Sequence, residues 1–268
     1  ARQLEDPTQD IMHNRVCAAL AYRIASDMDL PGNDRRLITA GDLLHNISKE
    51  DRTQVLTDAH LLQEASEMVG RLRETGRLAG SPAFWTDPVL FARTAVGANL
   101  SLVHHITGAI AAGGILESVK GFPAHDILRV QETILTHSTG YWYFRESVDQ
   151  AACAADAWRN VYPEPEGALA GIVHDADLIS QFDARSVVPE GSKWRALAAK
   201  RWGAKGAEEE AHVVYYVLQR LIEEARTPQG KALAEGEWSK VKPELVKLMR
   251  LPADSDPVRT LGIPKPFR

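Results

Sequence analysis

The chain has 268 residues, of which 44% are hydrophobic and 25% charged, and this ordinary globular composition excludes a disordered protein. The 31 Lys and Arg residues against 36 Asp and Glu residues give a formal net charge of −5, which disfavours bulk nucleic-acid binding. No apolar run reaches the roughly 18 residues that a membrane span needs, and two cysteines cannot form a disulfide framework. We therefore expect a cytoplasmic globular protein.

Helical periodicity dominates the sequence, and no segment alternates as a strand would. In the first predicted helix the apolar or small positions are Val16, Cys17, Leu20 and Ile24. The predicted helices begin at 13 and after the break at 31–33, and then cover about 58–78, 100–116, 127–137, 141–161, 166–181 and 208–226. The proline-rich tail after Leu251 is expected to be irregular. The pattern predicts an all-α fold with one helical domain over 1–235 and an extension over 236–268.

Several polar residues fall on the apolar faces of these predicted helices. They are His13, His45, His104, His137 and Asp177. At about 100° per residue Asp177 points inward with Val173, whereas Asp175 points the opposite way and is expected to be solvated. Each residue alone is better explained as a hydrogen-bonded core group, with Cys17 as core packing and a thiol ligand as its alternative. Five such residues on five helices together favour a metal site in the bundle.

The segment from 37 to 49, Leu-Ile-Thr-Ala-Gly-Asp-Leu-Leu-His-Asn-Ile-Ser-Lys, resembles the HD superfamily of metal-dependent phosphohydrolases. There an apolar helix ends in a His-Asp pair followed by a Lys, which His45 and Lys49 match. The upstream histidine of the family is matched by His13, and the downstream aspartate by Asp177 in His-Asp-Ala-Asp-Leu. The resemblance implies an HD-type bundle in which these residues hold the metal.

Two further matches point to the subset of the superfamily with extra histidines. His104 in Leu-Val-His-His-Ile-Thr-Gly-Ala, with His105 as its competitor, resembles the third histidine, and His137 in Thr-His-Ser-Thr-Gly resembles the fourth. This stretch is most similar to bacterial HD enzymes that hydrolyse dinucleoside tetraphosphates. The ordered matches span about 10–235, and the resemblance implies one or two divalent transition ions, Fe, Mn or Zn.

The chain departs from the family at Asn46, where the family has the aspartate that binds or bridges metals. A neutral amide is a much poorer ligand, so a second metal would be weakened most. Three explanations stay open: an engineered substitution, a natural single-metal site on His13, His45 and Asp177, or a site that has lost its metal. Asp42, one turn earlier on the same side, is a weak candidate to compensate.

The resemblance implies a hydrolase that uses a metal-activated water on a small phosphate ester or nucleotide. Lys49 is expected to contact a substrate phosphate, with a solvated lysine at the helix end as its alternative, and Asn46 is expected to orient water or substrate. The alternatives are an HD-type diiron oxygenase of a small polar substrate and a degenerate HD protein that binds a nucleotide or partner without turnover. The helix at 208–226 could pack internally or across a homodimer.

Overall fold

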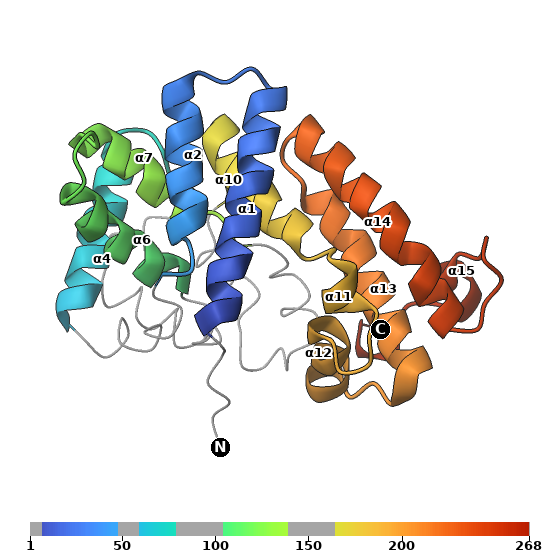
Figure 1. The fold of residues 1–268 in the computed structure, drawn as a ribbon. Coiled ribbons are helices and arrows are strands. Elements are labelled where there is room, and N and C mark those ends of the chain that lie inside the picture. The colour runs from blue at the N-terminus through green and yellow to red at the C-terminus, as the bar shows by residue number, and fades with distance from the viewer. Residues whose placement is uncertain (1–6, 48–58, 79–103, 139–163, 268) are drawn as a thin grey trace.

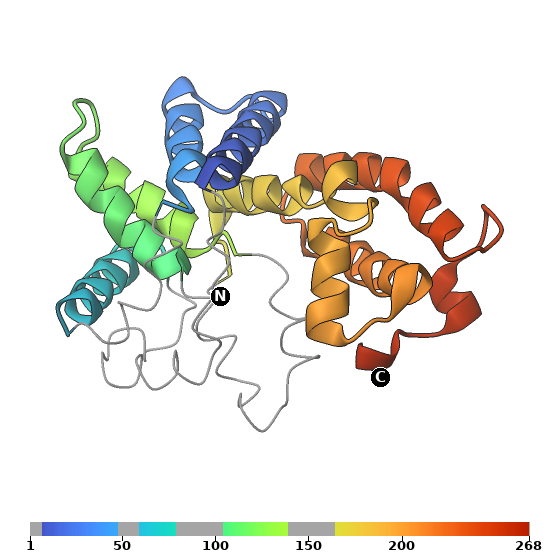
Figure 2. The same ribbon diagram turned by 60° about the horizontal axis from the view of Figure 1, so that its bottom comes forward.

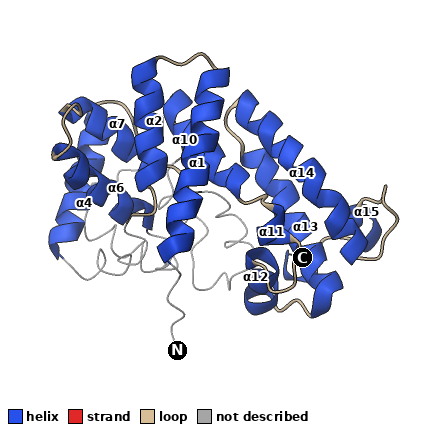
Figure 3. Cartoon of the chain, in the orientation of Figure 1, coloured by secondary structure: helices blue, strands red, loops and turns tan. Residues whose placement is uncertain are grey.

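The structure, a computed structural model, describes residues 7–47, 59–78, 104–138 and 164–267. All regular elements within these ranges are helices, which confirms the predicted all-α class (Figure 3). None of the described helices combines the length and apolar character that a bilayer crossing requires. The expected helix at 141–161 and the expected catalytic Lys49 lie outside the described residues.

The chain begins with an antiparallel pair of helices, and three further helices pack beside it (Figure 1). Apolar residues of the second to fifth of these helices form one core, in which Leu37, Met68 and Ile134 are fully buried or nearly so. The five helices are α1 (Pro7–Asp27), α2 (Gly32–Leu44), α4 (Ala59–Glu74), α6 (His104–Glu117) and α7 (Ala124–Leu135). They follow the predicted periodicity, except that Val16 is 43% exposed although it was expected on the apolar face.

Helix α10 (Gly167–Ser180) lies between the two halves of the molecule. It contacts α1, α2 and α7 on one side and the C-terminal helix α14 (Pro228–Leu248) on the other, as the turned view makes clear (Figure 2). The helix can be covered on both sides because its sequence is apolar or small nearly all round. Its central position places its polar residues at buried junctions rather than in solvent.

The C-terminal helices form a second core around Trp194, Tyr215 and Trp238, together with residues of α1 and α10. They are α11 (Ala184–Val187), α12 (Lys193–Trp202), α13 (Gly206–Leu221), η3 (Ile222–Glu224), α14, α15 (Pro257–Leu261) and η4 (Lys265–Phe267). The tail was expected to be irregular, but Asp256 caps α15 and Pro257 occupies its first turn, a combination that starts helices. The boundary predicted between 235 and 236 lies inside α14, whose Ala234 and Trp238 belong to the same core.

Candidate metal centre

Three of the predicted ligands converge from three helices. His13 comes from α1, His45 follows the end of α2, and Asp177 comes from α10. His13 Nε2 lies 3.3 Å from His45 Nε2 and 3.1 Å from Asp177 Oδ1, and His45 Nε2 lies 3.9 Å from the same carboxylate oxygen. Residues that are 32 and 164 positions away from His13 in sequence therefore present donor atoms to one small volume.

The backbone fixes the ring of His45 for ligation. Its Nδ1–H donates to the carbonyl of Asp42 at 2.7 Å, which leaves the lone pair on Nε2, the atom that faces His13 and Asp177. The side chain is fully buried, and burial is the main cause that holds the pKa of His45 well below its usual range. The imidazole is therefore neutral at neutral pH, which is the form that binds metals.

The other two donors are held by neighbouring side chains on α10. Ser180 donates its hydroxyl to the carbonyl of Asp177 at 2.6 Å, and its oxygen lies 3.4 Å from His13 Nδ1. Gln181 Nε2 donates to Asp177 Oδ1 at 3.4 Å. Burial by itself raises the pKa of Asp177, but the hydrogen bond with His13 and the nearby histidines outweigh it and hold the pKa well below its usual range.

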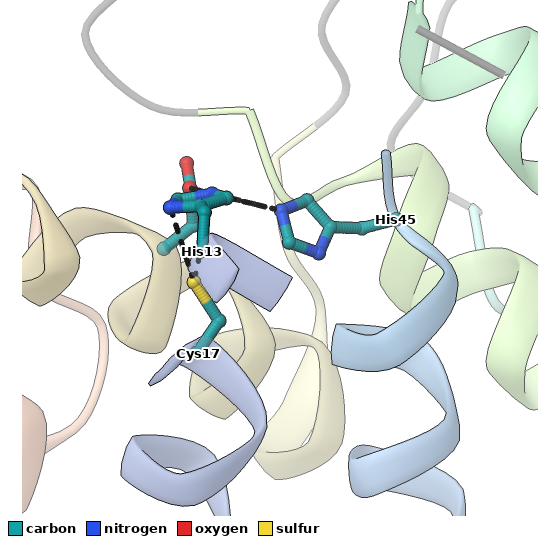
Figure 4. Close-up of side chains that lie close together, drawn as sticks. His13, Cys17 and His45 are labelled. Atoms are coloured by element: carbon teal, nitrogen blue, oxygen red, sulfur yellow. Dashed lines mark hydrogen bonds and ion pairs between the residues drawn. The ribbon is translucent and has the colours of Figure 1, made fainter. Parts of the chain in front are cut away.

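Cys17 completes a group of four ligand atoms. It lies one turn after His13 on α1, is fully buried, and places Sγ 3.6 Å from His13 Nε2 (Figure 4). The donor atoms of His13, Cys17, His45 and Asp177 all lie within 4.8 Å of one another, so these residues could hold a metal ion. Burial, together with Asp177 and Asp42, raises the pKa of the Cys17 thiol, so the thiolate needs a cation beside it.

The two remaining predicted histidines form an adjacent pair. His104 Nε2 lies 3.2 Å from His137 Nε2, and the ring of His137 packs edge-on against that of His45 with centroids 4.8 Å apart. His137 Nδ1–H donates to the carbonyl of Ile134 at 2.5 Å, so its other nitrogen faces His104. Helix α6 reaches this position because Gly108 passes the His45 carbonyl so closely that an added Cβ would lie 2.7 Å from that oxygen.

Asn46 occupies the remaining side of His45. Its amide nitrogen lies 2.7 Å from His45 Nε2 and donates to the lone pair that a metal would use. The same nitrogen donates to Asn14 Oδ1 at 3.3 Å, while Asn14 donates to the carbonyl of Leu43 at 3.1 Å. The amide thus competes with a metal for one ligand, whereas an aspartate at this position would leave the lone pair free for an ion.

The two polar residues that precede Asp177 in its motif are both buried. Asp175 was expected to be solvated but is fully buried, because α10 is covered by α14 on that side. His174 is also buried, and its Nδ1 lies 3.3 Å from Asp175 rather than beside the four-ligand group. His60 and His125 are exposed, whereas His212 is partly buried and donates to the Gly262 carbonyl at 2.9 Å.

Sequence reasoning missed the polar residues that support Asp177. Ser180 and Gln181 follow it by three and four residues, the spacing that shares a helix face, so this signal was present. Lys193, the first residue of α12, donates from Nζ to Gln181 Oε1 at 3.1 Å and so brings a cation near the ligand group. Nothing in the local pattern of α12 indicated that position.

Comparisons of the chain with family models, with curated proteins and with solved structures find no match.

Proposed function

We propose that the chain is a metal-dependent hydrolase of a phosphate ester or nucleotide, with an HD-type arrangement of ligands. The observation that carries the proposal is the convergence of His13 Nε2, His45 Nε2 and Asp177 Oδ1 within 3.9 Å of one another. Imidazole and carboxylate donors suit Fe, Mn and Zn. A divalent ion bound there lowers the pKa of a bound water and offers positive charge to a phosphate oxygen.

The group has a closed side and an open side, as a hydrolytic site needs. The side chain of His45 is 1% exposed, whereas those of His13 and Asp177 are 23% and 14% exposed. A substrate therefore approaches across His13 and Asp177. Lys193 reaches this part of the molecule through Gln181, and its charge can offset that of a phosphate. The pair His104 and His137 would serve a second ion beside the first.

The orientation of the histidine rings supports a working metal site over the alternative of a site that has lost its metal. Two carbonyls, those of Asp42 and Ile134, fix the rings of His45 and His137 so that their free nitrogens face other donors. A fold that only needs to fill a core gains nothing from several nitrogen and oxygen donors aimed at one volume, because buried polar groups cost free energy unless they are partnered. Asn46 is the feature that weakens the site, since its amide blocks one lone pair.

The test combines metal analysis with phosphate release from a panel of nucleotides and phosphomonoesters. The wild-type protein, purified without chelator, is expected to carry transition metal and release phosphate, and the His45→Ala variant is expected to lose both. His125→Ala, which removes a histidine that is 75% exposed, is the matched control and should retain both. Asn46→Asp should raise the metal content and the rate, because it adds a charged ligand in place of the blocking amide.

Two results would contradict the proposal. One is a wild-type protein and an Asn46→Asp variant that both release no phosphate from any member of the panel. The other is a His45→Ala variant with unchanged metal content. Oxygen consumption that depends on substrate in the reduced iron form would instead support the oxygenase alternative.

A further inference from the structure

Cys17 offers a ligand that the HD resemblance does not supply. The i, i+4 spacing on α1 places it on the same helix face as His13, and its side chain is fully buried. Cys17 and His45 approach the ring of His13 from two different directions (Figure 4). The sulfur atom therefore faces the same volume as the two nitrogens and the carboxylate oxygen, and all four atoms lie within 4.8 Å of one another.

The spacing of the donors matches a tetrahedral site. For zinc with two nitrogens, one oxygen and one sulfur, tetrahedral geometry places nitrogens about 3.3 Å from each other and about 3.6 Å from the sulfur. His13 Nε2 lies 3.3 Å from His45 Nε2 and 3.6 Å from Cys17 Sγ. Its distance to Asp177 Oδ1 is 3.1 Å. The 3.9 Å between His45 Nε2 and Asp177 Oδ1 would have to shorten on metal binding, and all pairs of donor atoms lie within 4.8 Å.

The charges of the group also match a divalent ion. Two neutral imidazoles and one carboxylate supply a single negative charge. The aspartate of the HD motif would supply a second negative charge, but Asn46 at this position is neutral. A thiolate at Cys17 restores a second negative charge next to the ion. Sulfur is a soft ligand, which Zn²⁺ and Co²⁺ accept and which Mg²⁺ and Mn²⁺ avoid.

We propose that Cys17 is the fourth protein ligand of the metal and makes the site selective for thiophilic divalent ions such as Zn²⁺ over Mn²⁺ and Mg²⁺. As the metal–sulfur bond forms, the thiol releases its proton to solvent, and no oxidation state changes. The partly exposed side at His13 and Asp177 leaves room for a further ligand, since zinc sites expand to five-coordinate during reactions. This inference rests on the metal-binding part of the proposed function and is independent of hydrolysis.

The experiment titrates Co²⁺ into the chelator-treated full chain and records its absorption. A cobalt–thiolate bond gives a near-ultraviolet charge-transfer band, and we expect this band in the wild-type protein. The sequence contains one other cysteine, Cys153, so Cys153→Ser is the matched control and should keep the band. Cys17→Ser should lose it and should lower Zn²⁺ affinity by at least about 10-fold, with Mn²⁺ affinity changed far less.

A second readout does not require the Cys17→Ser variant to fold. In the Cys153→Ser protein Cys17 is the one remaining cysteine, so a cobalt–thiolate band there comes from Cys17, and excess Zn²⁺ should abolish this band whereas Mg²⁺ should not. Cobalt binding without the band, or a band that survives Cys17→Ser, would overturn the role of Cys17 and leave the rest of the metal site standing. No cobalt binding at all would overturn this inference and the metal-dependent function together. A band that depends on Cys17 in a protein without phosphatase activity would support this inference and contradict the hydrolase alone.

Discussion

Helix α10 carries two aspartates, two residues apart, whose surroundings differ in one decisive respect. Asp175 accepts three hydrogen bonds at 2.7–2.8 Å, from the backbone N–H groups of Arg226 and Thr227 and from the Thr227 hydroxyl. Asp177 faces His13, His45 and Cys17, each of which has a donor atom that can bind a metal. A carboxylate that accepts hydrogen bonds from the backbone stabilises the fold. A carboxylate that lies beside other possible metal ligands can take part in binding a metal.

The comparison extends to the helices that α10 joins. On the side of Asp175, Thr227 caps α14 by accepting from the Gly230 N–H at 2.9 Å, so one carboxylate anchors the start of a 21-residue helix. On the side of Asp177, His13 of α1 contacts the Ser180 hydroxyl, and His45, which follows α2, donates to the Asp42 carbonyl. The first junction is closed and satisfied, and the second is partly open.

The largest effect should follow removal of the anchoring carboxylate. Asp175→Ala leaves three donors without their acceptor, and we expect a loss of about 3–5 kcal/mol in the free energy of unfolding. Asp177→Asn should cost less than about 2 kcal/mol in the metal-free protein, because its side chain is partly exposed, but should lower metal affinity by at least about 100-fold. Urea unfolding with chelator present measures the first quantity, and equilibrium dialysis of Zn²⁺ measures the second.

The opposite order of stability losses would contradict this contrast between Asp175 and Asp177. If Asp177→Asn destabilised the metal-free protein more than Asp175→Ala does, the site would be a structural junction like its neighbour. Asp183→Asn is the control for substitutions near α10, because the Asp183 side chain is 38% exposed and bonds Arg185 of the four-residue helix α11.

Two glycines of α14 give a smaller and independent test of the anchor. A Cβ at Gly230 would overlap the Asp175 carboxylate, whereas one at Gly236 would meet nothing within 4 Å. We expect Gly230→Ala to destabilise by about 1–3 kcal/mol through overpacking. Gly236→Ala on the same helix should instead stabilise by about 0.5–1 kcal/mol, because alanine favours the helical backbone. Thermal unfolding compares the two variants. Equal melting temperatures would show that the Asp175 carboxylate can shift to accommodate the added methyl group.

The sequence could predict the helices and the convergence of His13, His45 and Asp177, because periodicity places each on an inward face. It could not predict the burial of Asp175. Helical geometry gives the angle between two side chains, but it does not say whether a second layer covers the opposite face. The near-uniform apolar composition of α10 was the available signal that both faces are covered.

The start of α14 could also have been predicted from the sequence. Thr227 is the N-cap of this helix and Pro228 occupies its first turn, a combination that is typical of a helix start. The role of Lys193 could not be predicted, because it depends on how α12 returns to α10 through Gln181. Long-range returns of this kind are set by packing and leave no local pattern.

The last prediction concerns Asp42, a buried carboxylate whose surroundings differ from those of Asp175. It is fully buried, and within the described residues neither of its carboxylate oxygens has a hydrogen-bond partner. Burial, reinforced by the charge of Asp177, raises its pKa well above the ordinary 3.8. A raised pKa means that its stability contribution is complete below pH 3.8 and is lost as the pH rises through the folded-state value.

Asp42→Asn should therefore stabilise the metal-free protein at neutral pH, by about 1 kcal/mol or about 2–4 °C in melting temperature. The gain should shrink to nothing as the pH falls toward 4, where the wild-type carboxyl is protonated as well. Asp27→Asn, at a side chain that is 53% exposed, should show no such gain. A destabilised Asp42→Asn protein would mean that the carboxylate is stabilised by a cationic partner. Asp42 and Asp175 would then differ in the kind of group that stabilises them, and not in whether they have such a group.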